Sequence, residues 1–260
     1  MMLTMRGVLA RLPGHRFGPF DLALAAGEHV AILGPSGAGK STLLRLLAGE
    51  RSVHAGALQF QGRALAAWPR QALARQRAVL PQSHNVAFGM PVELVVALGR
   101  IARDADPGQA GIVAQALQAA CAAHLADRRF DTLSGGEQAR VQLARVLAQL
   151  WDVRSGLLLV DEPLAALDPG LQFELMHALR SFAQTRGHAL VAVLHDLNQA
   201  LAGFERLWLV DRGRLVADLP TGRAAVPALE RLFGITLRCI DGEDGRLAVL
   251  ARRALPAGVA

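Results

Sequence analysis

Short runs of aliphatic residues give the first indication of the fold. Residues 157–160 are all aliphatic, residues 189–194 are apolar throughout, and residues 28–33 become apolar from Val30 onward. Runs of this length are too short for most helices and lack polar alternation, which is typical of strands buried on both faces of a parallel sheet. We therefore expect a central sheet that contains these three segments.

Apolar residues recur at helical spacing elsewhere. In residues 138–150 the larger apolar positions from Val141 to Leu147 return on one side of a helix, as expected when one face packs against neighbours. Further helices are expected in four segments: 42–49, 92–100, 108–125 and 223–233. Because several of these helices follow one another, we expect a helical subdomain over residues 83–155.

Shorter strands surround the central runs. Residues 1–33 contain strands that lead toward the centre of the sheet, and residues 57–62 alternate and end in glycine as a hairpin strand does. Residues 77–82 form a short strand that stops at a proline, and residues 206–216 are expected to form a hairpin. Buried strands, hairpins and helices together indicate an α/β fold.

The segment after the first aliphatic run carries glycines in a pattern typical of phosphate binding. It reads Gly34, Pro35, Ser36, Gly37, Ala38, Gly39, Lys40, Ser41, which matches G-x-x-x-x-G-K-S, and Thr42 follows. The glycines let backbone N–H groups approach phosphate oxygens at a helix N-terminus, whose dipole favours negative charge. Lys40 would reach the terminal phosphates, and the Ser41 hydroxyl would bind Mg²⁺. We expect a nucleoside triphosphate here.

A second helix begins with glycines at residues 133–138, Leu-Ser-Gly-Gly-Glu-Gln. Ser134 stands at the N-cap position, and Gly135 and Gly136 would expose backbone N–H groups at the positive end of the helix. This is a second site suited to phosphate, although one nucleotide per chain has no obvious use for both. From the residues alone, an ordinary capped helix is an equally open interpretation.

Acidic residues and a histidine follow two of the aliphatic runs. Asp161 and Glu162 directly follow residues 157–160, and His195 ends the run at 189–194. Ligands of parallel sheets bind at the carboxyl ends of the strands, so these side chains are expected at the ligand. One carboxylate can hold Mg²⁺ through water, and the other can orient or deprotonate an attacking water.

Composition narrows the class of protein. Of 260 residues, 52% are hydrophobic and 19% are charged, as expected of a globular protein. The net charge of +6 comes mostly from scattered arginines, with no Lys/Arg cluster of the kind that binds a nucleic-acid backbone. The chain has no apolar stretch long enough to span a bilayer and begins without a signal-peptide pattern, so we expect it in the cytoplasm. Cys121 and Cys239 have no C-x-x-C spacing and are expected to be reduced and buried.

In their order along the chain, these segments resemble the ATP-binding cassette (ABC) ATPases. The P-loop is shared with kinases and GTPases, but LSGGEQ upstream of LLLVDEP, with a later LHDL, is specific. The resemblance covers nearly the whole chain and implies a single domain over residues 1–260. Residues 1–82 and 156–260 would form a P-loop NTPase (RecA-like) core with an antiparallel β subdomain, and residues 83–155 the inserted α-helical subdomain with the signature motif.

The resemblance also assigns roles to individual residues. Nucleotide would be bound by residues 34–42 together with Gln82, Ser134, Gly135, Gly136, Gln138 and Asp168. Mg²⁺ would be bound by Ser41, Gln82 and Asp161. The catalytic residues would be Lys40, Glu162 as the general base, and His195 on the γ-phosphate.

The resemblance also implies a function for the helix N-terminus at residues 133–138. Two cassettes pack head to tail, so Ser134–Gly136 of one chain would contact the ATP held by Lys40 of the other. Hydrolysis would then require a second copy of this chain, with two ATP molecules in the pair.

One position departs from the family pattern. The aromatic residue that usually stacks on adenine falls near Arg11, and the chain has no tyrosine. Arg11 could stack through its guanidinium plane, or Phe17 could approach the base.

The chain looks like the separate ATPase subunit of a bacterial transporter. Residues 80–82, 91–100 and 133–151 are most similar to the haem (hemin) importer ATPases, although vitamin B12 and ferric-siderophore importers share the pattern. The implied location is peripheral, on the cytoplasmic face of the inner membrane. The implied partners are a permease dimer, contacted by the loop 83–91, and indirectly a periplasmic haem-binding protein; nucleic acid is not expected. A soluble ABC protein of DNA repair or translation, or a nucleotide kinase, is the alternative.

Overall fold

The computed structural model describes residues 1–12, 15–81, 89–162, 167–242 and 247–252. They form two compact units. The P-loop unit comprises residues 3–23, 28–59 and 191–260, and the helix-rich unit comprises residues 1–2, 24–27 and 60–190. Within the described ranges, no helix combines the length and the apolar character needed to cross a bilayer.

The P-loop unit contains an antiparallel sheet near the N-terminus. Its strands β1 (Leu3–Leu12), β2 (His15–Leu24) and β4 (Ala55–Phe60) lie in the order β2-β1-β4. The backbone N–H of His54 donates to Leu9 O at 2.7 Å, which joins the approach to β4 to the end of β1. This arrangement agrees with the expected antiparallel β subdomain.

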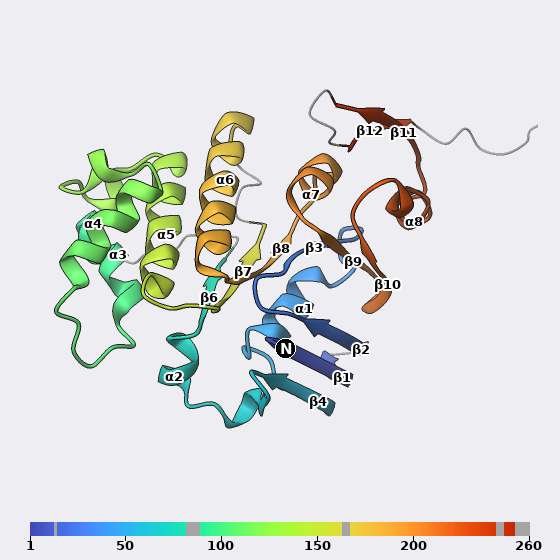
Figure 1. Ribbon diagram of the computed structural model, residues 1–260, viewed down its shortest axis with the longest axis horizontal. Coiled ribbons are helices and arrows are strands. Elements are labelled where there is room, and N and C mark those ends of the chain that lie inside the picture. The colour runs from blue at the N-terminus through green and yellow to red at the C-terminus, as the bar shows by residue number, and fades with distance from the viewer. Residues whose placement is uncertain (13–14, 82–88, 163–166, 243–246, 253–260) are drawn as a thin grey trace, which may run out of the picture. The chain divides into compact units, whose positions relative to one another are not determined.

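The aliphatic strand before the P-loop lies inside a second sheet of the same unit. All residues of β3 (His29–Leu33) are buried, and β3 pairs in parallel with β9 (Arg206–Asp211). The antiparallel strand β10 (Arg214–Pro220) continues the sheet beyond β9. Helix α1 (Lys40–Leu47) follows the P-loop (Figure 1). All of its leucines are buried.

In the C-terminal part of the P-loop unit, the sequence predicted a helix over residues 223–233 and no element after it. After α7 (Leu197–Gly203), η5 (Arg223–Ala225) and α8 (Val226–Phe233), the strands β11 (Thr236–Asp241) and β12 (Leu247–Arg252) form an antiparallel pair. This pair is attached to α7, because the Asn198 side chain bonds to both the N–H and the C=O of Val249, at 2.7 and 3.2 Å. Residues 236–241 and 247–252 therefore have a defined structure that their sequence pattern did not indicate.

Parallel strands also run through the helix-rich unit. Strand β6 (Arg77–Leu80) pairs with β7 (Leu157–Asp161) so that Leu80 is aligned with Val160. The start of β8 (Ala189–Val193) adjoins this pair, because Ala189 N donates to Gly156 O at 2.9 Å. The shorter elements of this unit before β6 are β5 (Arg63–Ala64), η1 (Leu65–Ala67) and α2 (Arg70–Ala74).

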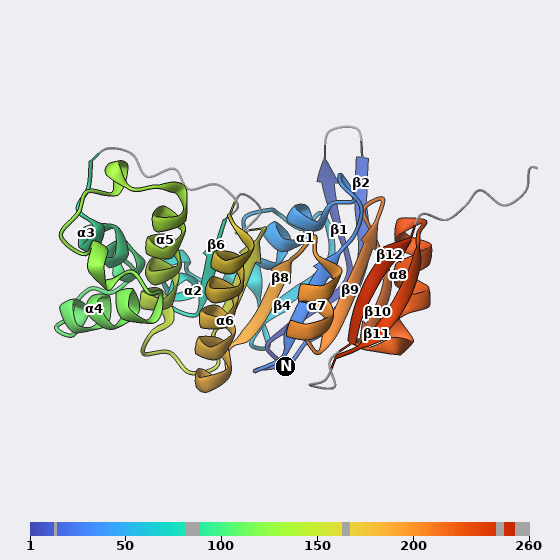
Figure 2. The ribbon, with the colours of Figure 1, turned by 90° about the horizontal axis from the view of Figure 1, so that it is seen from above.

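The other helices of the helix-rich unit follow β6 along the chain. They are α3 (Val92–Ala97), η2 (Leu98–Arg100), α4 (Gln109–Ala119), η3 (Ala123–Leu125), η4 (Phe130–Thr132), α5 (Gly135–Leu150) and α6 (Pro169–Arg186). Helices α3, α4 and α5 pack against one another, as Figures 1 and 2 show. The backbone approaches closely where Gly99 meets α5, since a Cβ there would lie 2.2 Å from Arg145 O.

Two expectations from the sequence need correction. The single helix expected over residues 108–125 is interrupted, because α4 ends at Ala119 and Cys121 has φ +52°, a left-handed conformation that stops an α-helix. Both cysteines are free, but Cys121 is exposed and Cys239 partly exposed, so the prediction that they are buried was wrong.

Candidate functional site

Lys40 is held inside the P-loop of the P-loop unit. Its side chain is only 4% exposed, and Nζ donates to the carbonyl oxygens of Gly34 and Pro35, at 3.0 and 3.2 Å. These bonds bend the side chain back over the loop that precedes it. A buried ammonium group beside glycine N–H groups at a helix N-terminus is an arrangement suited to the phosphates of a nucleotide.

The ring of Phe17, on strand β2 of the antiparallel sheet, packs against the P-loop. A Cβ added at Gly39 would lie 1.6 Å from Cζ of Phe17, and one added at Gly213 would lie 3.0 Å from the same ring. Two backbone hydrogen bonds join the segments next to this ring. Gly213 N donates to Ala38 O at 2.9 Å, and Gly18 N donates to Gly213 O at 2.7 Å. The β9–β10 turn and strand β2 therefore hold the P-loop in place.

Phe17 and Gly213 are the residues that sequence reasoning missed in this role. Phe17 was considered for adenine, but it is 6% exposed with its ring against two glycines. The hairpin turn at Arg212-Gly213 was expected, but its sequence carries no sign of contact with the P-loop. Such proximity comes from tertiary structure, and no motif reveals it.

His195 belongs to the same unit as the P-loop. Leu194 N donates to Ile32 O at 3.2 Å, so the end of β8 runs beside the end of β3, from which the P-loop starts. His195 is exposed, and the next residue, Asp196, caps α7 by accepting from Asn198 N and Gln199 N. The histidine thus lies at the strand end where parallel sheets bind ligands.

The signature helix α5 begins with a capping box in the helix-rich unit. The Glu137 carboxylate accepts from both Ser134 N and Ser134 Oγ at 2.8 Å, while Glu137 N donates to Ser134 Oγ at 3.4 Å. The hydrogen bond from Ser134 N is the main reason that the pKa of Glu137 is lowered, with help from the Ser134 hydroxyl and from Arg128. Ser134 and Gly135 are nevertheless exposed, so the start of this helix is accessible to a ligand.

The signature helix lies beside the start of α6. A Cβ at Gly136 would come within 2.6 Å of the Leu171 side chain, and Arg140 pairs with Glu174 at 2.7 Å. Asp168 is the N-cap of α6 and accepts from Leu171 N at 2.9 Å. The structure thus brings the Ser-Gly-Gly segment and Asp168 to two neighbouring helix N-termini.

The two acidic residues end β7 as predicted. Asp161 is 6% exposed, whereas Glu162 is partly exposed and has φ +44°, which residues with a side chain adopt rarely. Backbone conformations of this kind cluster at functional sites. The parallel register of Leu80 with Val160 brings the residues that follow both strands to the same edge of the sheet. Gln82, predicted there, lies outside the described residues.

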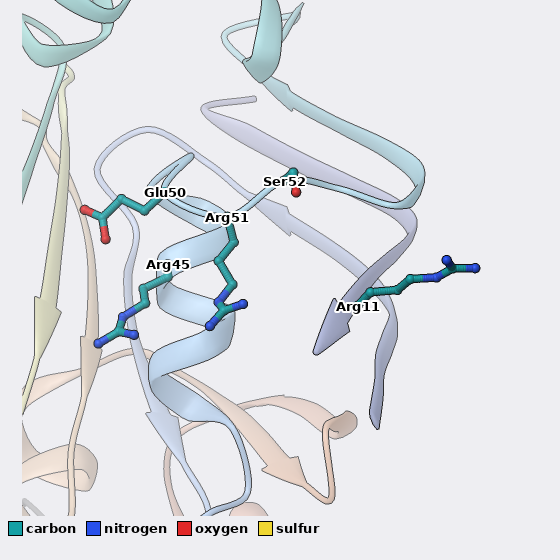
Figure 3. Close-up of a pocket in the computed structure, with 5 residues that line it drawn as sticks. All are labelled: Arg11, Arg45, Glu50, Arg51 and Ser52. Atoms are coloured by element: carbon teal, nitrogen blue, oxygen red, sulfur yellow. The ribbon is translucent and has the colours of Figure 1, made fainter. Parts of the chain in front are cut away.

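The predicted site residues therefore fall into two groups. The P-loop and His195 belong to the P-loop unit, and Ser134, Asp161, Glu162 and Asp168 belong to the helix-rich unit. Arg11 lies near the end of β1 and lines an open cavity with residues at the end of α1 (Figure 3).

Comparison with known proteins gives one family and many relatives. The model of the ABC transporter family matches residues 17–165. The Hemin import ATP-binding protein HmuV of Pseudomonas entomophila (strain L48) is 46% identical over 243 residues, which cover 90% of this chain and 93% of the relative. The protein of the same name from Methylobacillus flagellatus is 42% identical, with 88% of each chain covered.

Solved structures show the same fold. An inward-facing metal-chelate type ABC transporter matches with a TM-score of 0.81 at 24% identity, covering 97% of this chain and 98% of that one. The dimeric structure of a bacterial ABC transporter cassette, MJ0796, matches with a TM-score of 0.74 at 24% identity, covering 85% and 99%. The expected P-loop NTPase fold is thereby confirmed.

Proposed function

The chain belongs to the ABC transporter family, and we propose that it is the ATP-binding and ATP-hydrolysing subunit of a bacterial importer for haem (hemin). The observation that carries this proposal is the P-loop, in which Lys40 is buried against Gly34 O and Pro35 O. The haem cargo is supported by relatives named for hemin import that are 42–46% identical over most of both chains. We further propose that residues 1–260 form one ABC ATPase domain, with a helical subdomain over residues 83–155.

The P-loop would hold the phosphates of ATP. Residues 34–42 would supply backbone N–H groups and the Lys40 ammonium, and Gly37 supports this because its α-carbon faces open space, with no atom within 4 Å of an added Cβ. Phe17 packs against Gly39, so its ring is not available to stack on adenine.

The donors fit Mg²⁺. Ser41 follows Lys40 in the first turn of α1, and Asp161 is a buried carboxylate at a strand end. Hydroxyl and carboxylate oxygens are the ligands that Mg²⁺ prefers, and we propose Ser41, Asp161 and Gln82 for this role. The ion would neutralise phosphate charge.

The remaining site residues would complete hydrolysis. Glu162 would orient the attacking water and accept its proton, and His195 would donate to the γ-phosphate. Ser134, Gly135, Gly136 and Gln138, with Asp168, would serve the ATP of a second copy of the chain. The exposure of Ser134 and Gly135 supports this, because a segment used across an interface must be accessible in one chain.

A permease dimer in the inner membrane would be the partner that converts closure of the ATPase pair into transport, with the chain peripheral on the cytoplasmic side. Exposed apolar side chains on the helix-rich unit support such docking: Leu94 is 48% exposed and Ile101 78% exposed. The periplasmic haem-binding protein would act through the permease.

The experiment that tests the cargo is ATPase stimulation in proteoliposomes containing this chain and its permease. Haem-loaded binding protein should raise the ATPase rate severalfold, whereas the apoprotein should not. Stimulation by vitamin B12 or a ferric siderophore in place of haem would assign the chain to those importers. ATP hydrolysis that needs no permease, together with failure to co-purify with any membrane protein, would contradict the importer proposal.

A further inference from the structure

An open cavity of about 440 Å³ lies at the C-terminal end of α1 in the P-loop unit. Its lining consists of Arg11, Arg45, Glu50, Arg51 and Ser52 (Figure 3). Arg45 lies on α1, Glu50 to Ser52 follow that helix, and Arg11 comes from β1. The lining thus contains three guanidinium groups and one carboxylate.

The three guanidinium groups have no side-chain partner within the described residues. In the part of the chain that the structure describes, the side chains of Arg11, Arg45 and Arg51 form no ion pair and no hydrogen bond, and Nε of Arg51 is buried without a partner. Some arginines of the same unit do have acidic partners: Arg206, for example, pairs with Glu28 and Asp218. Arg11 and Arg45 are exposed, so this cost falls on Arg51: an unpaired buried donor is costly, and its Nε favours an external acceptor.

Helix capping does not account for these arginines. A basic residue in the last turn of a helix often serves the free carbonyl groups there. In this chain backbone groups do so instead: Glu50 N and Arg51 N both donate to Arg45 O, at 2.9 and 3.3 Å. The guanidinium groups are therefore left available for another ligand.

The chemistry of the lining selects a phosphate group. Guanidinium groups present planar sets of N–H donors that match phosphate oxygens, and the Ser52 hydroxyl adds a further donor. Several cations around one cavity are best compensated by a ligand with more than one negative charge. A phosphate monoester or a diphosphate meets both requirements, whereas a single carboxylate satisfies fewer donors.

This cavity is separate from the phosphate-binding loop. Lys40 is the first residue of α1, and the cavity follows its last turn. A helix of 8 residues spans about 12 Å, so one phosphate cannot serve both ends.

We propose that the cavity formed by Arg11, Arg45, Arg51 and Ser52 is a second phosphate-binding site, distinct from the P-loop. Its phosphate comes either from a free multivalent anion or from the headgroup of an anionic phospholipid. The ligand would screen the positive charge at the end of α1, where Arg45 and Arg51 lie, with Arg11 at the β1 side of the cavity.

Pyrophosphate is the probe for the first test. The full chain is used with Lys40→Ala, so that the P-loop does not contribute, and binding is measured by calorimetry. Adding Arg45→Gln and Arg51→Gln should weaken pyrophosphate binding by about tenfold or more, because charge-assisted hydrogen bonds are lost. The matched control removes the same charge from exposed positions of the C-terminal hairpin, with Arg238→Gln and Arg252→Gln, and should change binding by less than about twofold.

Vesicles distinguish the two sources of phosphate. If a phospholipid is the ligand, the chain sediments with phosphatidylglycerol vesicles but not with phosphatidylcholine vesicles, pyrophosphate competes, and the Arg45/Arg51 double variant stays in solution. Pyrophosphate binding without sedimentation assigns the site to a free anion. Equal losses in both double variants, or no binding to either probe, overturn the proposal. A wild-type series saturated with a non-hydrolysable ATP analogue repeats the comparison without the Lys40 substitution, and ATP binding to the wild-type chain tests the P-loop separately.

Discussion

The ring of Phe17 occupies the space that a side chain at Gly39 would need. A Cβ at Gly39 would lie 1.6 Å from Cζ of Phe17, and Gly39 also has φ +101°. Gly37 has a comparable backbone requirement, φ +75°, but nothing lies within 4 Å of an added Cβ. A substitution at Gly37 therefore incurs only the cost of the backbone conformation, whereas one at Gly39 also incurs the cost of steric overlap.

Gly39→Ala should impair the P-loop much more than Gly37→Ala. Both substitutions place alanine in the left-handed region, at a cost of about 1–2 kcal/mol. Only Gly39→Ala must also displace the Phe17 ring, which adds at least about 1–3 kcal/mol of overpacking strain. Thermal unfolding and ATP binding by calorimetry measure both effects. Adding Phe17→Ala to Gly39→Ala should restore part of the ATP affinity; equal defects in the two single variants would argue against a role for the ring.

Glu162→Gln should retain ATP binding and stop hydrolysis. The amide keeps the size of the side chain but cannot accept a proton from water, and loss of a general base lowers rates by about 10²–10⁴-fold. The variant should therefore accumulate as an ATP-bound dimer, which size-exclusion chromatography with light scattering detects. Normal turnover would remove Glu162 from the role of base.

Ser134→Arg should abolish hydrolysis while each chain still binds ATP. The exposed N-cap position of α5 is proposed to face the ATP of a second copy, and a guanidinium group there would keep the two chains apart. Because this change also removes the capping box, Ser134→Ala is the control: it loses the same cap, worth about 1 kcal/mol, without adding bulk. ATPase assays and nucleotide binding on both variants separate the effects. Full hydrolysis by a monomeric Ser134→Arg chain would end the shared-site proposal.

The buried Arg100 should contribute more to stability than an exposed arginine with a similar ion pair. Arg100, with its side chain 1% exposed, pairs with Asp106 at 2.6 Å and with Asp152 at 2.8 Å, and the pKa of Asp152 is lowered to about 2, chiefly by the Arg100 hydrogen bond. Arg100→Met should cost about 2–4 kcal/mol, because carboxylates packed around it lose their counterion.

The matched control is Arg75→Met. Arg75 pairs with Asp104 at 2.9 Å, but both side chains are exposed, 38% and 81%, so the loss should stay below about 1 kcal/mol. Urea unfolding of the two variants measures the difference. Equal losses would show that burial of the ion pair is not what matters.

His188 should make the free energy of unfolding depend on pH between about 6.5 and 4. This fully buried side chain accepts from Gly156 N through Nδ1 at 2.8 Å, and desolvation, with Arg186 nearby, lowers its pKa to about 4. Between the unfolded and folded pKa values only the unfolded chain binds the proton. Stability is therefore complete above pH 6.5 and is lost as the pH falls toward 4, by about 2 kcal/mol between pH 7 and pH 5.

Urea unfolding at a series of pH values tests this prediction. The control is His188→Asn, which keeps an acceptor for Gly156 N but has no proton to bind in this range. This variant should lose most of the extra slope. An unchanged slope would show that other groups cause the pH dependence.

Patterns within short stretches of sequence were sufficient to predict the buried strands, the start of α5 and the P-loop. The aliphatic runs became β3, β7 and β8, and the helix expected near residue 138 became α5, with Ser134 as its cap. Uninterrupted apolar runs favour buried strands, and a serine followed three residues later by glutamate favours a helix start, whatever the rest of the chain does. The P-loop is likewise contiguous, so its residues could be named from the sequence.

Contacts between distant segments were decided only by the tertiary structure. Phe17 and Gly213 clasp the P-loop, Asn198 holds β12, Gly136 lies against Leu171, and the unpaired arginines of β1 and α1 line one cavity. Each pair or set is far apart along the chain and carries no pattern that refers to its partner. Periodicity and motifs encode local conformation. Contacts between different elements depend instead on how their side chains pack, and this packing is established only in the folded chain.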